Sequence, residues 1–343
     1  MRESEAPSLL ISVIVPCRNE LEHIDAFCDS VLEQALPNGW QMEVLIADGE
    51  SDDGTREKLL QRCAADSRFV LVANPGRIVS SGLNACIGKA RGSVIARLDV
   101  HSRFASDYLA QCLAALGRTG ADNVGGPWVA KGETPTGQAV AVAFQCRWVI
   151  GGALSRDASY EGEADTVYLG CWRAAVFEQH GLFDESLVRN QDDEHNLRLR
   201  RRGARIWQSH LIRSCYRPRD SLRHLFNQQR QYGYWRPFVM RKHGQPGSLR
   251  QIVPALFVAA LVASIAISPW APLPLAVLAV AYSAYLGMAS LAAVRHTYRW
   301  TLLPHVALAI AAFHLGYGIG TWRGLWDMAC RRKPSSDLVR ITR

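Results

Sequence analysis

Three short clusters of polar residues are the part of this sequence best suited to chemistry. Carboxylates crowded into one site repel one another, and a bound divalent cation removes that cost. Any single cluster also has a structural explanation, because polar turns after strands, acidic helix caps and acidic first helical turns are common. Three such clusters in succession favour a metal-binding site. They are Asp48 with Asp52 and Asp53, Asp99-Val-His101, and Asp192-Asp193-Glu194.

The first cluster follows a short apolar run, Val44-Leu45-Ile46, which predicts a buried strand. Ligands of α/β sheets bind where the carboxyl ends of strands open into loops. The loop from Asp48 to Thr55 has neither the glycine-rich pattern nor the lysine of a Walker loop. Its carboxylates and hydroxyls suit a ribose, a base N–H or a metal-held diphosphate.

The second cluster has the spacing of a metal motif. Side chains at positions i and i+2 of an extended chain share a face, so Asp99 and His101 can bind the same ion. The third cluster leads into a basic segment that predicts the end of a helix, residues 197–203.

The elements expected around these clusters alternate between strands and helices. This alternation predicts a parallel, doubly wound α/β sheet in the first hundred residues, and the pattern becomes irregular after about residue 120. The expected strands cover residues 9–15, 44–47, 68–72 and 94–98, and the expected helices cover residues 22–34, 55–65 and 78–90.

Composition places the front of the chain in a reducing compartment. The nine cysteines form no Cys-x-x-Cys pair, which indicates reduced, buried thiols. The first residues lack the apolar segment of a signal peptide, so we expect this part in the cytoplasm. The net charge of +8 is placed beside apolar segments, which favours contact with membrane over nucleic acid.

The C-terminal part is typical of a membrane anchor. No Asp, Glu, Lys, Arg or His occurs between Gln251 and Val294, and this stretch is long enough for two spans separated at residues 269–272. Buried core helices are the alternative, but such helices usually keep a polar face. We therefore expect a domain of residues 1–240 and a membrane region of residues 241–343, with apolar segments at about 251–268, 272–294 and 303–322.

The third apolar segment leaves its topology open. The positive-inside rule places residues 236–250 and 295–299 in the cytoplasm, in agreement with two crossings. A third crossing would carry Arg323 and residues 331–333 to the opposite side. The alternatives are a crossing against the rule, a re-entrant hairpin and a helix in the membrane interface.

Four motifs, in this order, resemble family 2 glycosyltransferases of the GT-A fold, and within that family the succinoglycan-type glucosyltransferases. The resemblance covers about residues 10–240, and residues 165–170, 181–185 and 231–235 support it. The motifs are Ser12-Val-Ile-Val-Pro-Cys-Arg-Asn-Glu20, Asp48-Gly-Glu-Ser-Asp-Asp-Gly-Thr55, Asp99-Val-His101 and Gln191-Asp192-Asp193-Glu194.

The resemblance implies a role for each motif. It places Asp192 as the catalytic base, with Asp193 and Glu194 as acceptor-side alternatives one or two positions away. Asp99 and His101 take the metal positions for Mg²⁺ or Mn²⁺, although His101 replaces the usual second aspartate. Trp235 is a further acceptor-side candidate, or else part of an aromatic belt at the membrane. The nucleotide-sugar contacts are assigned to Pro16, Arg18, Glu20, Asp48, Arg77 and Asp99.

The activity implied is that of a membrane-associated, metal-dependent, inverting hexosyltransferase. It would transfer a sugar, glucose by the resemblance, from a UDP-sugar to a saccharide on a polyprenyl diphosphate lipid, in exopolysaccharide or other surface-glycan synthesis. We expect a multi-pass protein of the inner membrane with its catalytic domain in the cytoplasm. The basic stretch 217–250 would face anionic headgroups or the lipid diphosphate.

Three other functions fit the sequence less well. A processive synthase would carry a Gln-x-x-Arg-Trp motif, whereas Gln231 is followed by Tyr-Gly-Tyr-Trp. A nucleotidyltransferase would need a glycine-rich basic loop after the first strand, which Pro16-Cys-Arg-Asn19 does not supply. An inactive scaffold is disfavoured by the presence of acidic residues at 48, 99 and 192.

Overall fold

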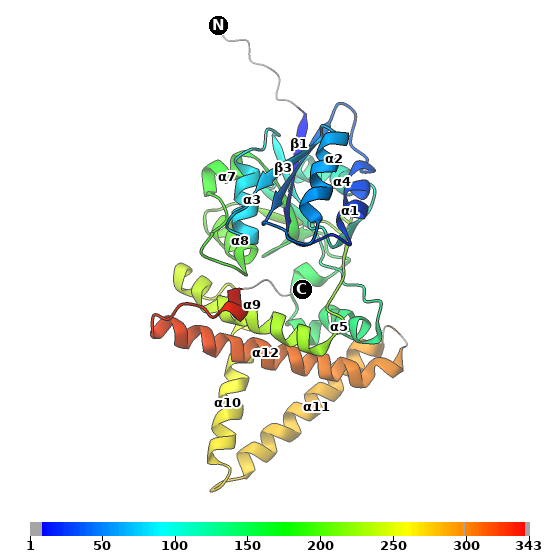
Figure 1. Cartoon of the computed structure of the whole chain (residues 1–343). Helices are drawn as coiled ribbons and strands as arrows, with labels where there is room; N and C mark the ends of the chain where they lie inside the picture. Colours follow the sequence, from blue (N-terminus) through cyan, green and yellow to red (C-terminus); the bar gives the residue numbers. More distant parts are fainter. Residues whose placement is uncertain (1–8, 296, 298, 340–343) are drawn as a thin grey trace. The chain divides into compact units, whose positions relative to one another are not determined.

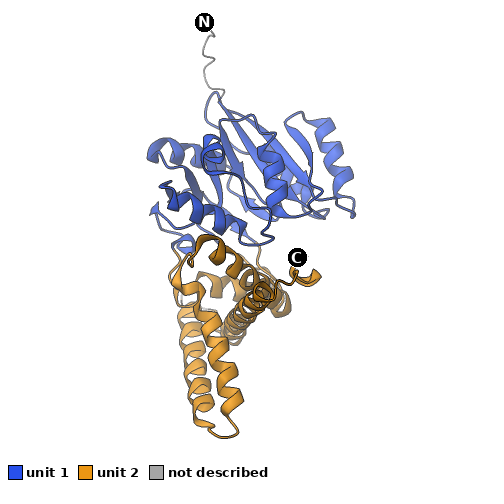
Figure 2. Ribbon diagram, turned by 90° about the vertical axis from the view of Figure 1, so that its left-hand side faces the viewer, with its two compact units in different colours: residues 1–129, 154–216 blue, residues 130–153, 217–343 orange. Residues whose placement is uncertain are grey.

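The computed structural model describes residues 9–295, 297 and 299–339; our expectation for the extreme N-terminus lies largely outside them. The chain forms two compact units. Unit 1 comprises residues 1–129 and 154–216, and unit 2 comprises residues 130–153 and 217–343 (Figure 2). We expected the domain boundary near residue 240, but residues 217–240 and the internal segment 130–153 belong to the unit that contains the apolar helices.

The first half of the sheet in unit 1 is parallel. Its strands lie in the order β3-β2-β1-β4 and begin and end within a few residues of the expected positions. Alternate residues of β1 serve opposite faces, because Val13 and Val15 pack in one core cluster and Ile14 in the other. These strands are β1 (Leu10–Cys17), β2 (Gln41–Asp48), β3 (Phe69–Ala73) and β4 (Val94–Arg97).

The second half of the sheet is mixed, and its strands come from the part of the sequence after residue 120, where the alternating pattern becomes irregular. Strand β8 (Tyr168–Arg173) runs antiparallel to both β4 and β6 (Asn123–Gly126). The chain reaches β8 after a long irregular excursion that includes unit 2 residues, and it returns in the opposite direction. The remaining strands are β7 (Gly162–Glu163) and β9 (Ile206–Gln208) at the edge, and β5 (Ser102–Phe104) and β10 (Ser214–Tyr216) in a separate small sheet.

Helices cover both faces of the sheet (Figure 1). The cluster that contains Val13 includes side chains of α1 and α4, and the cluster that contains Ile14 includes side chains of α3 and α7. The described residues contain no disulfide, and six of the nine cysteines are buried. The helices of unit 1 are α1 (Ile24–Leu32), α2 (Thr55–Ala65), α3 (Val79–Ile87), α4 (Tyr108–Thr119), η1 (Leu154–Arg156), α7 (Ala175–His180) and α8 (Gln191–Arg201).

Unit 2 is helical, and three of its segments are long and apolar enough to cross a membrane. These are residues Leu249–Ile267, Leu273–Arg295 and Trp300–Ala329. The helices are α5 (Pro135–Gln145), α6 (Arg147–Ile150), α9 (Leu222–His243), η2 (Leu249–Gln251), α10 (Val253–Ile267), α11 (Leu273–Arg295), η3 (Trp300–Leu302), α12 (Leu303–Ala329) and α13 (Ser336–Val339).

The stretch rich in arginine, glutamine and aromatic residues forms α9, which packs against α12 and α13. Tyr234 donates its hydroxyl to Asp327 at 3.2 Å, and Arg236 donates to the Tyr317 hydroxyl at 2.9 Å. The sequence composition of α9 thus reflects a polar contact between helices. The internal segment 130–153 joins the same unit, since the Tyr285 hydroxyl donates to the Trp148 carbonyl at 2.9 Å.

Candidate active site

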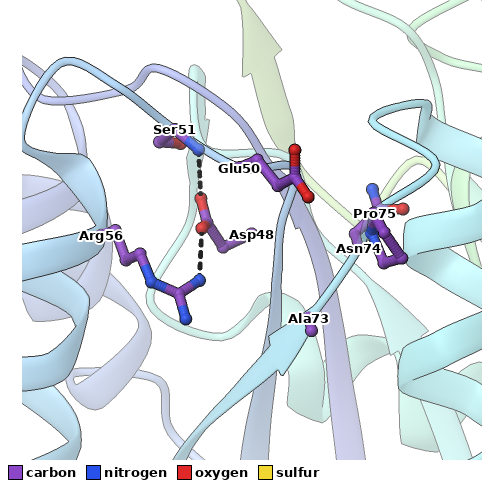
Figure 3. A pocket seen from close by; sticks show the side chains of 7 residues that line it. All are labelled: Asp48, Glu50, Ser51, Arg56, Ala73, Asn74 and Pro75. Carbon is purple, nitrogen blue, oxygen red and sulfur yellow. Dashed lines mark hydrogen bonds and ion pairs between the residues drawn. The ribbon is translucent and has the colours of Figure 1, made fainter.

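Asp48 stands at the carboxyl end of β2, fully buried, at the base of a pocket of about 390 Å³ (Figure 3). Its Oδ1 accepts the backbone N–H of Ser51 at 3.2 Å, and its Oδ2 pairs with Nη1 of Arg56 at 2.9 Å. A buried carboxylate at this edge can accept a hydrogen bond from an N–H or hydroxyl group of a ligand. Arg56 would have to give up part of its contact with Asp48 for the ligand to bind there. The pocket is lined by Asp48, Glu50, Ser51, Arg56, Ala73, Asn74 and Pro75.

Arg56 was missed by the sequence reasoning, although a signal was present. It is the second residue of α2, where the helix dipole favours acidic side chains, so a basic residue at this position calls for a carboxylate partner. Its side chain is 44% exposed, so it can move away from Asp48 when a ligand enters.

The other acids of the first cluster hold the loops in place. Asp52 and Asn19 exchange hydrogen bonds at 2.8 and 3.0 Å, and Asp53 accepts the Leu21 backbone N–H at 3.1 Å. Burial raises the pKa of Asp53, but hydrogen bonds from Thr55 and Leu21 outweigh it and hold that pKa below its usual value. The cluster therefore divides into a pocket residue, Asp48, and two residues that fasten the loop after β1.

The other expected nucleotide contacts lie on loops around this edge. Pro16 is in β1, and Arg18 packs with its Cβ and Cδ against Gly49. Arg77 has a left-handed backbone, with φ of 56°, and its guanidinium pairs with the pocket residue Glu50. Glu20 is buried and turns instead toward His101, with 3.6 Å between Oε1 and Nδ1.

Arg97 links the second and third acidic clusters. The residue is 6% exposed. Its guanidinium makes a two-point contact with Asp99, Nε to Oδ1 at 3.0 Å and Nη2 to Oδ2 at 3.1 Å. Burial lowers the pKa of Arg97, but the charges of Asp99 and Asp192 raise it above its ordinary value. Two acids more than ninety residues apart in sequence thus act on one buried cation.

Sequence reasoning also missed Arg97. The signal was a charged residue in an otherwise apolar strand, two positions before Asp99 and therefore on the same face of the extended chain. A buried arginine needs a carboxylate partner, and Asp99 was the nearest candidate.

Asp192 is the second residue of α8 and has the electrostatic surroundings of a proton acceptor. Burial and the charge of Asp193 raise its pKa, and Arg97 opposes them. Its Oδ1 accepts the backbone N–H of Asp193 at 2.9 Å. An aspartate with a raised pKa is a stronger base than an ordinary one when ionised.

Glu194 and His195 serve the interior of unit 1. Glu194 is fully buried, and its two oxygens accept from Arg198 at 3.1 Å each. This contact gives Glu194 a structural reason for its charge, so it is not a good alternative to Asp192. His195 packs among Phe177 and Phe183, and burial lowers its pKa to about 3, so the ring is neutral at physiological pH.

The expected metal position lies at Asp99 and His101. Over the described part of the chain, no group of three or more His, Cys, Asp or Glu side chains is arranged to hold a metal. Asp99 and His101 offer two ligands, and a cation there would share Asp99 with Arg97. Such sites commonly use one or two protein ligands and take further oxygens from a substrate diphosphate, so the pair fits a cation bound together with its nucleotide.

Three aromatic residues surround the second cluster, and none was expected there. Tyr168 shares a hydrogen bond with Ser102 at 2.8 Å, and burial together with Asp99 raises its pKa. Trp128 lies against Tyr216, with ring centroids 4.9 Å apart, and the guanidinium of Arg156 sits 3.3 Å from the Trp128 ring centroid. These residues come from separate segments, so no local pattern could place them together.

Trp235 lies in unit 2, in the middle of α9. It is 5% exposed and donates its indole N–H to the Leu338 carbonyl at 3.1 Å. Its packing against α13 gives a structural reason for the residue, and we do not retain it as a ring that stacks on a sugar.

The fold and these motifs define a nucleotide-sugar transferase of the GT-A type, and the comparisons identify its family. Residues 12–173 match the family model described as Glycosyl transferase family 2. The chain is 32% identical over 335 residues to the succinoglycan biosynthesis protein ExoA of Rhizobium meliloti (strain 1021), which covers 96% of this chain and 99% of that protein. The chain belongs to the family 2 glycosyltransferases.

Two further proteins illustrate the range of relatives. One is a UDP-Glc:alpha-D-GlcNAc-diphosphoundecaprenol beta-1,3-glucosyltransferase, WfgD, of Escherichia coli, 38% identical over 91 residues that cover 26% of this chain and 34% of that protein. The other is the solved structure of the mannosyltransferase PcManGT from Pyrobaculum calidifontis in complex with GDP-Man and Mn²⁺. It is similar with a TM-score of 0.59 and 18% identity, over 94% of this chain and 88% of that one, which confirms the GT-A fold.

Proposed function

We propose that the chain is a metal-dependent, inverting hexosyltransferase that moves glucose from UDP-glucose to a saccharide carried on a polyprenyl diphosphate lipid, in the synthesis of an exopolysaccharide or another surface glycan. The observation that carries the proposal is the buried Arg97 guanidinium, which Asp99 grips directly and on which the charge of Asp192 also acts. Arg97 thus connects Asp99, the expected metal ligand, with Asp192, the expected catalytic base.

The donor would occupy the Asp48 pocket and extend toward Asp99. A uracil N–H is a good donor to the buried Asp48 carboxylate. Arg56, which pairs with Asp48 in the structure, would turn toward solvent or toward the nucleotide phosphates. Pro16 lies near the end of β1, and Arg18 and Arg77 lie on the loops that follow β1 and β3. Glu20 would act through His101.

Asp192 would perform the proton transfer. It would take the proton of an acceptor hydroxyl as that oxygen attacks the anomeric carbon from the side opposite the diphosphate, and the bond to the diphosphate would break with its electron pair. One displacement of this kind inverts the anomeric configuration. Asp99 and His101 would hold a divalent cation, Mg²⁺ or Mn²⁺, which when bound neutralises the diphosphate charge.

The acceptor is proposed from the membrane helices and the relatives. Three candidate spans support association with a membrane, and WfgD is named for a diphosphoundecaprenol acceptor. We expect the active site on the cytoplasmic side of the inner membrane, because UDP-sugars are cytoplasmic. The positive-inside rule places the basic residues of α9 on the same side. Tyr216 lies 5.9 Å from the His101 ring, and Tyr168 and Trp128 pack with it, so these three aromatic residues are candidates for the acceptor side.

The test is transfer of radiolabelled glucose from UDP-glucose to endogenous lipid in membranes that contain the full chain, with GDP-mannose as the competing donor. We expect Asp192→Asn to lower transfer by about 10²- to 10⁴-fold, the usual contribution of a general base. Asp193→Asn is the matched control and should keep most activity. Full transfer by Asp192→Asn would remove it from this role. A ladder of products longer than one added sugar would instead indicate a processive synthase.

A further inference from the structure

Helix α12 has the composition of a membrane span, but it packs against a helix that carries many charged side chains. It has 27 residues, about 40 Å of helix, against a bilayer core of about 30 Å. Its principal partner within unit 2 is α9, which is not among the candidate spans. Charged or titratable side chains occur along the whole of α9, namely Arg223, His224, Arg230, Arg236, Arg241, Lys242 and His243.

Glycines bring α12 into backbone contact with α9. A Cβ added at Gly316 would lie 2.6 Å from the Phe226 carbonyl oxygen, and one at Gly320 would lie 2.1 Å from that of Arg230. The third position repeats the pattern, since a Cβ at Gly324 would lie 2.2 Å from the Tyr234 carbonyl oxygen.

Both helices advance by four residues at each contact and in the same direction, so they run parallel, side by side. Side-chain contacts secure the same pairing further along. Asp327 of α12 is fully buried and accepts from Tyr234 of α9. The Tyr317 hydroxyl of α12 accepts from Arg236. Two helices held in this way share their tilt and depth in a membrane.

That constraint decides against a crossing by α12. If α12 spanned the bilayer, the adjacent length of α9 would enter it as well, together with Arg230 and Arg236. An arginine at the centre of a bilayer is strongly disfavoured, and the pairing of Arg230 with Asp337 would bring a carboxylate into the same layer. Residues 331–333 would also have to be carried to the far side.

The arrangement within unit 2 agrees with this conclusion. Helices α10 and α11 form a V-shaped hairpin, and α12 lies across its open end next to α9 (Figure 1). The hairpin contains only uncharged residues as far as Val294, and Trp270 at its turn is 84% exposed. A hairpin that enters the bilayer therefore leaves α12 close to the membrane plane.

We propose that α9 and α12 lie as a pair in the headgroup region of the membrane and that only α10 and α11 enter the hydrocarbon core. The occupant of the outer face of the pair is lipid. Exposed apolar side chains on α12 suit the boundary between headgroups and acyl chains, where tryptophan is favoured. They are Leu308, Ile319, Trp322 and Trp326. Arg323 and residues 331–333 then stay on the same side as the basic end of α9, which satisfies the positive-inside rule.

The structure provides a native probe for this topology. Cys330 follows α12 directly and is exposed, and trypsin releases it in its own peptide, residues 324–331. Gln245→Cys, in the exposed loop after α9, gives a matched second site in peptide 243–250. Sealed inverted and right-side-out vesicles that contain the full chain are treated with a membrane-impermeant maleimide, and labelling is read at each peptide by mass spectrometry.

We expect Cys330 and Gln245→Cys to label from the same face of the membrane. This comparison holds whether or not the α10–α11 hairpin reaches the far side, because the hairpin returns the chain to the side on which it entered. Labelling from opposite faces would overturn the proposal, since it requires a crossing by α12. Labelling of Cys330 only after detergent would also overturn it, since it places the end of α12 inside the bilayer.

Discussion

Two arginines, one in each unit, are equally buried at 6% exposure and have different partners. Arg97 of unit 1 grips Asp99 at the carboxyl edge of a sheet, and Arg236 of unit 2 donates to the Tyr317 hydroxyl between two helices. Burial of a charge alone therefore does not indicate a functional site. The surroundings of the charge distinguish the two residues. Arg97 pairs with Asp99 and is acted on by the charge of Asp192, whereas Arg236 joins two packed helices.

Among the substitutions that test this difference between Arg97 and Arg236, we expect the largest loss of activity and stability at Arg97. Arg97→Met leaves Asp99 with no guanidinium partner, and breaking such a buried pair costs about 3–5 kcal/mol. Arg97→Lys keeps the charge but loses the two-point contact, so we expect it to restore folding and part of the activity. Steady-state transfer assays and thermal unfolding separate the two effects.

Arg236 is the matched control for that experiment. Arg236→Lys should lower the thermal stability of the membrane-extracted chain and leave kcat and KM for the donor close to those of the unchanged chain. If Arg97→Lys and Arg236→Lys affected transfer equally, the distinction between the two buried arginines would be lost.

The next largest effect concerns the two kinds of acid in the first cluster. Asp48→Asn removes the charge that would receive a donor N–H, and a hydrogen bond to a charged group contributes about 1.5–3 kcal/mol. We expect KM for UDP-glucose to rise by roughly 10- to 100-fold, with a smaller change in kcat. Titration calorimetry with UDP measures the same loss without turnover.

Asp52→Asn provides the comparison, because Asp52 contacts Asn19 and does not line the pocket. Its expected effect is a small loss of stability with unchanged UDP affinity. Equal losses of affinity for Asp48→Asn and Asp52→Asn would show that the whole loop, and not Asp48, determines nucleotide binding.

A smaller effect is expected from the glycine contacts of unit 2. Gly320→Ala forces a Cβ to within 2.1 Å of a backbone oxygen, and overpacking of this kind costs about 1–3 kcal/mol. Gly287→Ala in α11 is the control, because a Cβ there meets nothing within 4 Å. Thermal unfolding in detergent should show a lower midpoint for Gly320→Ala alone, and equal midpoints would contradict the tight α9–α12 contact.

The sequence predicted those parts of the fold that depend on local pattern. Apolar runs that end at Asp48 and shortly before Asp99 predicted β2 and β4, and the resemblance assigned roles to Asp48, Asp99 and Asp192. The reversal of β8 and the packing of Gly320 against Arg230 could not be predicted, because both depend on contacts between distant segments. The burial of Glu194 could not be predicted either, because in the sequence Glu194 is an acidic residue two positions from Asp192 and nothing shows that it pairs with Arg198.

The smallest predicted effect is a pH shift that separates Asp192 from Asp193. Burial and the charge of Asp193 raise the pKa of Asp192, and a base must be ionised to accept a proton. Activity is therefore lost as pH falls through that raised pKa, so the acid limb of kcat lies at a higher pH than an ordinary aspartate would give. Asp193→Asn removes one of the charges that raise the pKa of Asp192 and should move the acid limb to lower pH. An acid limb that stayed in place, or moved upward, would contradict the electrostatic coupling of these two neighbours and, with it, the assignment of Asp192 as the titrating base.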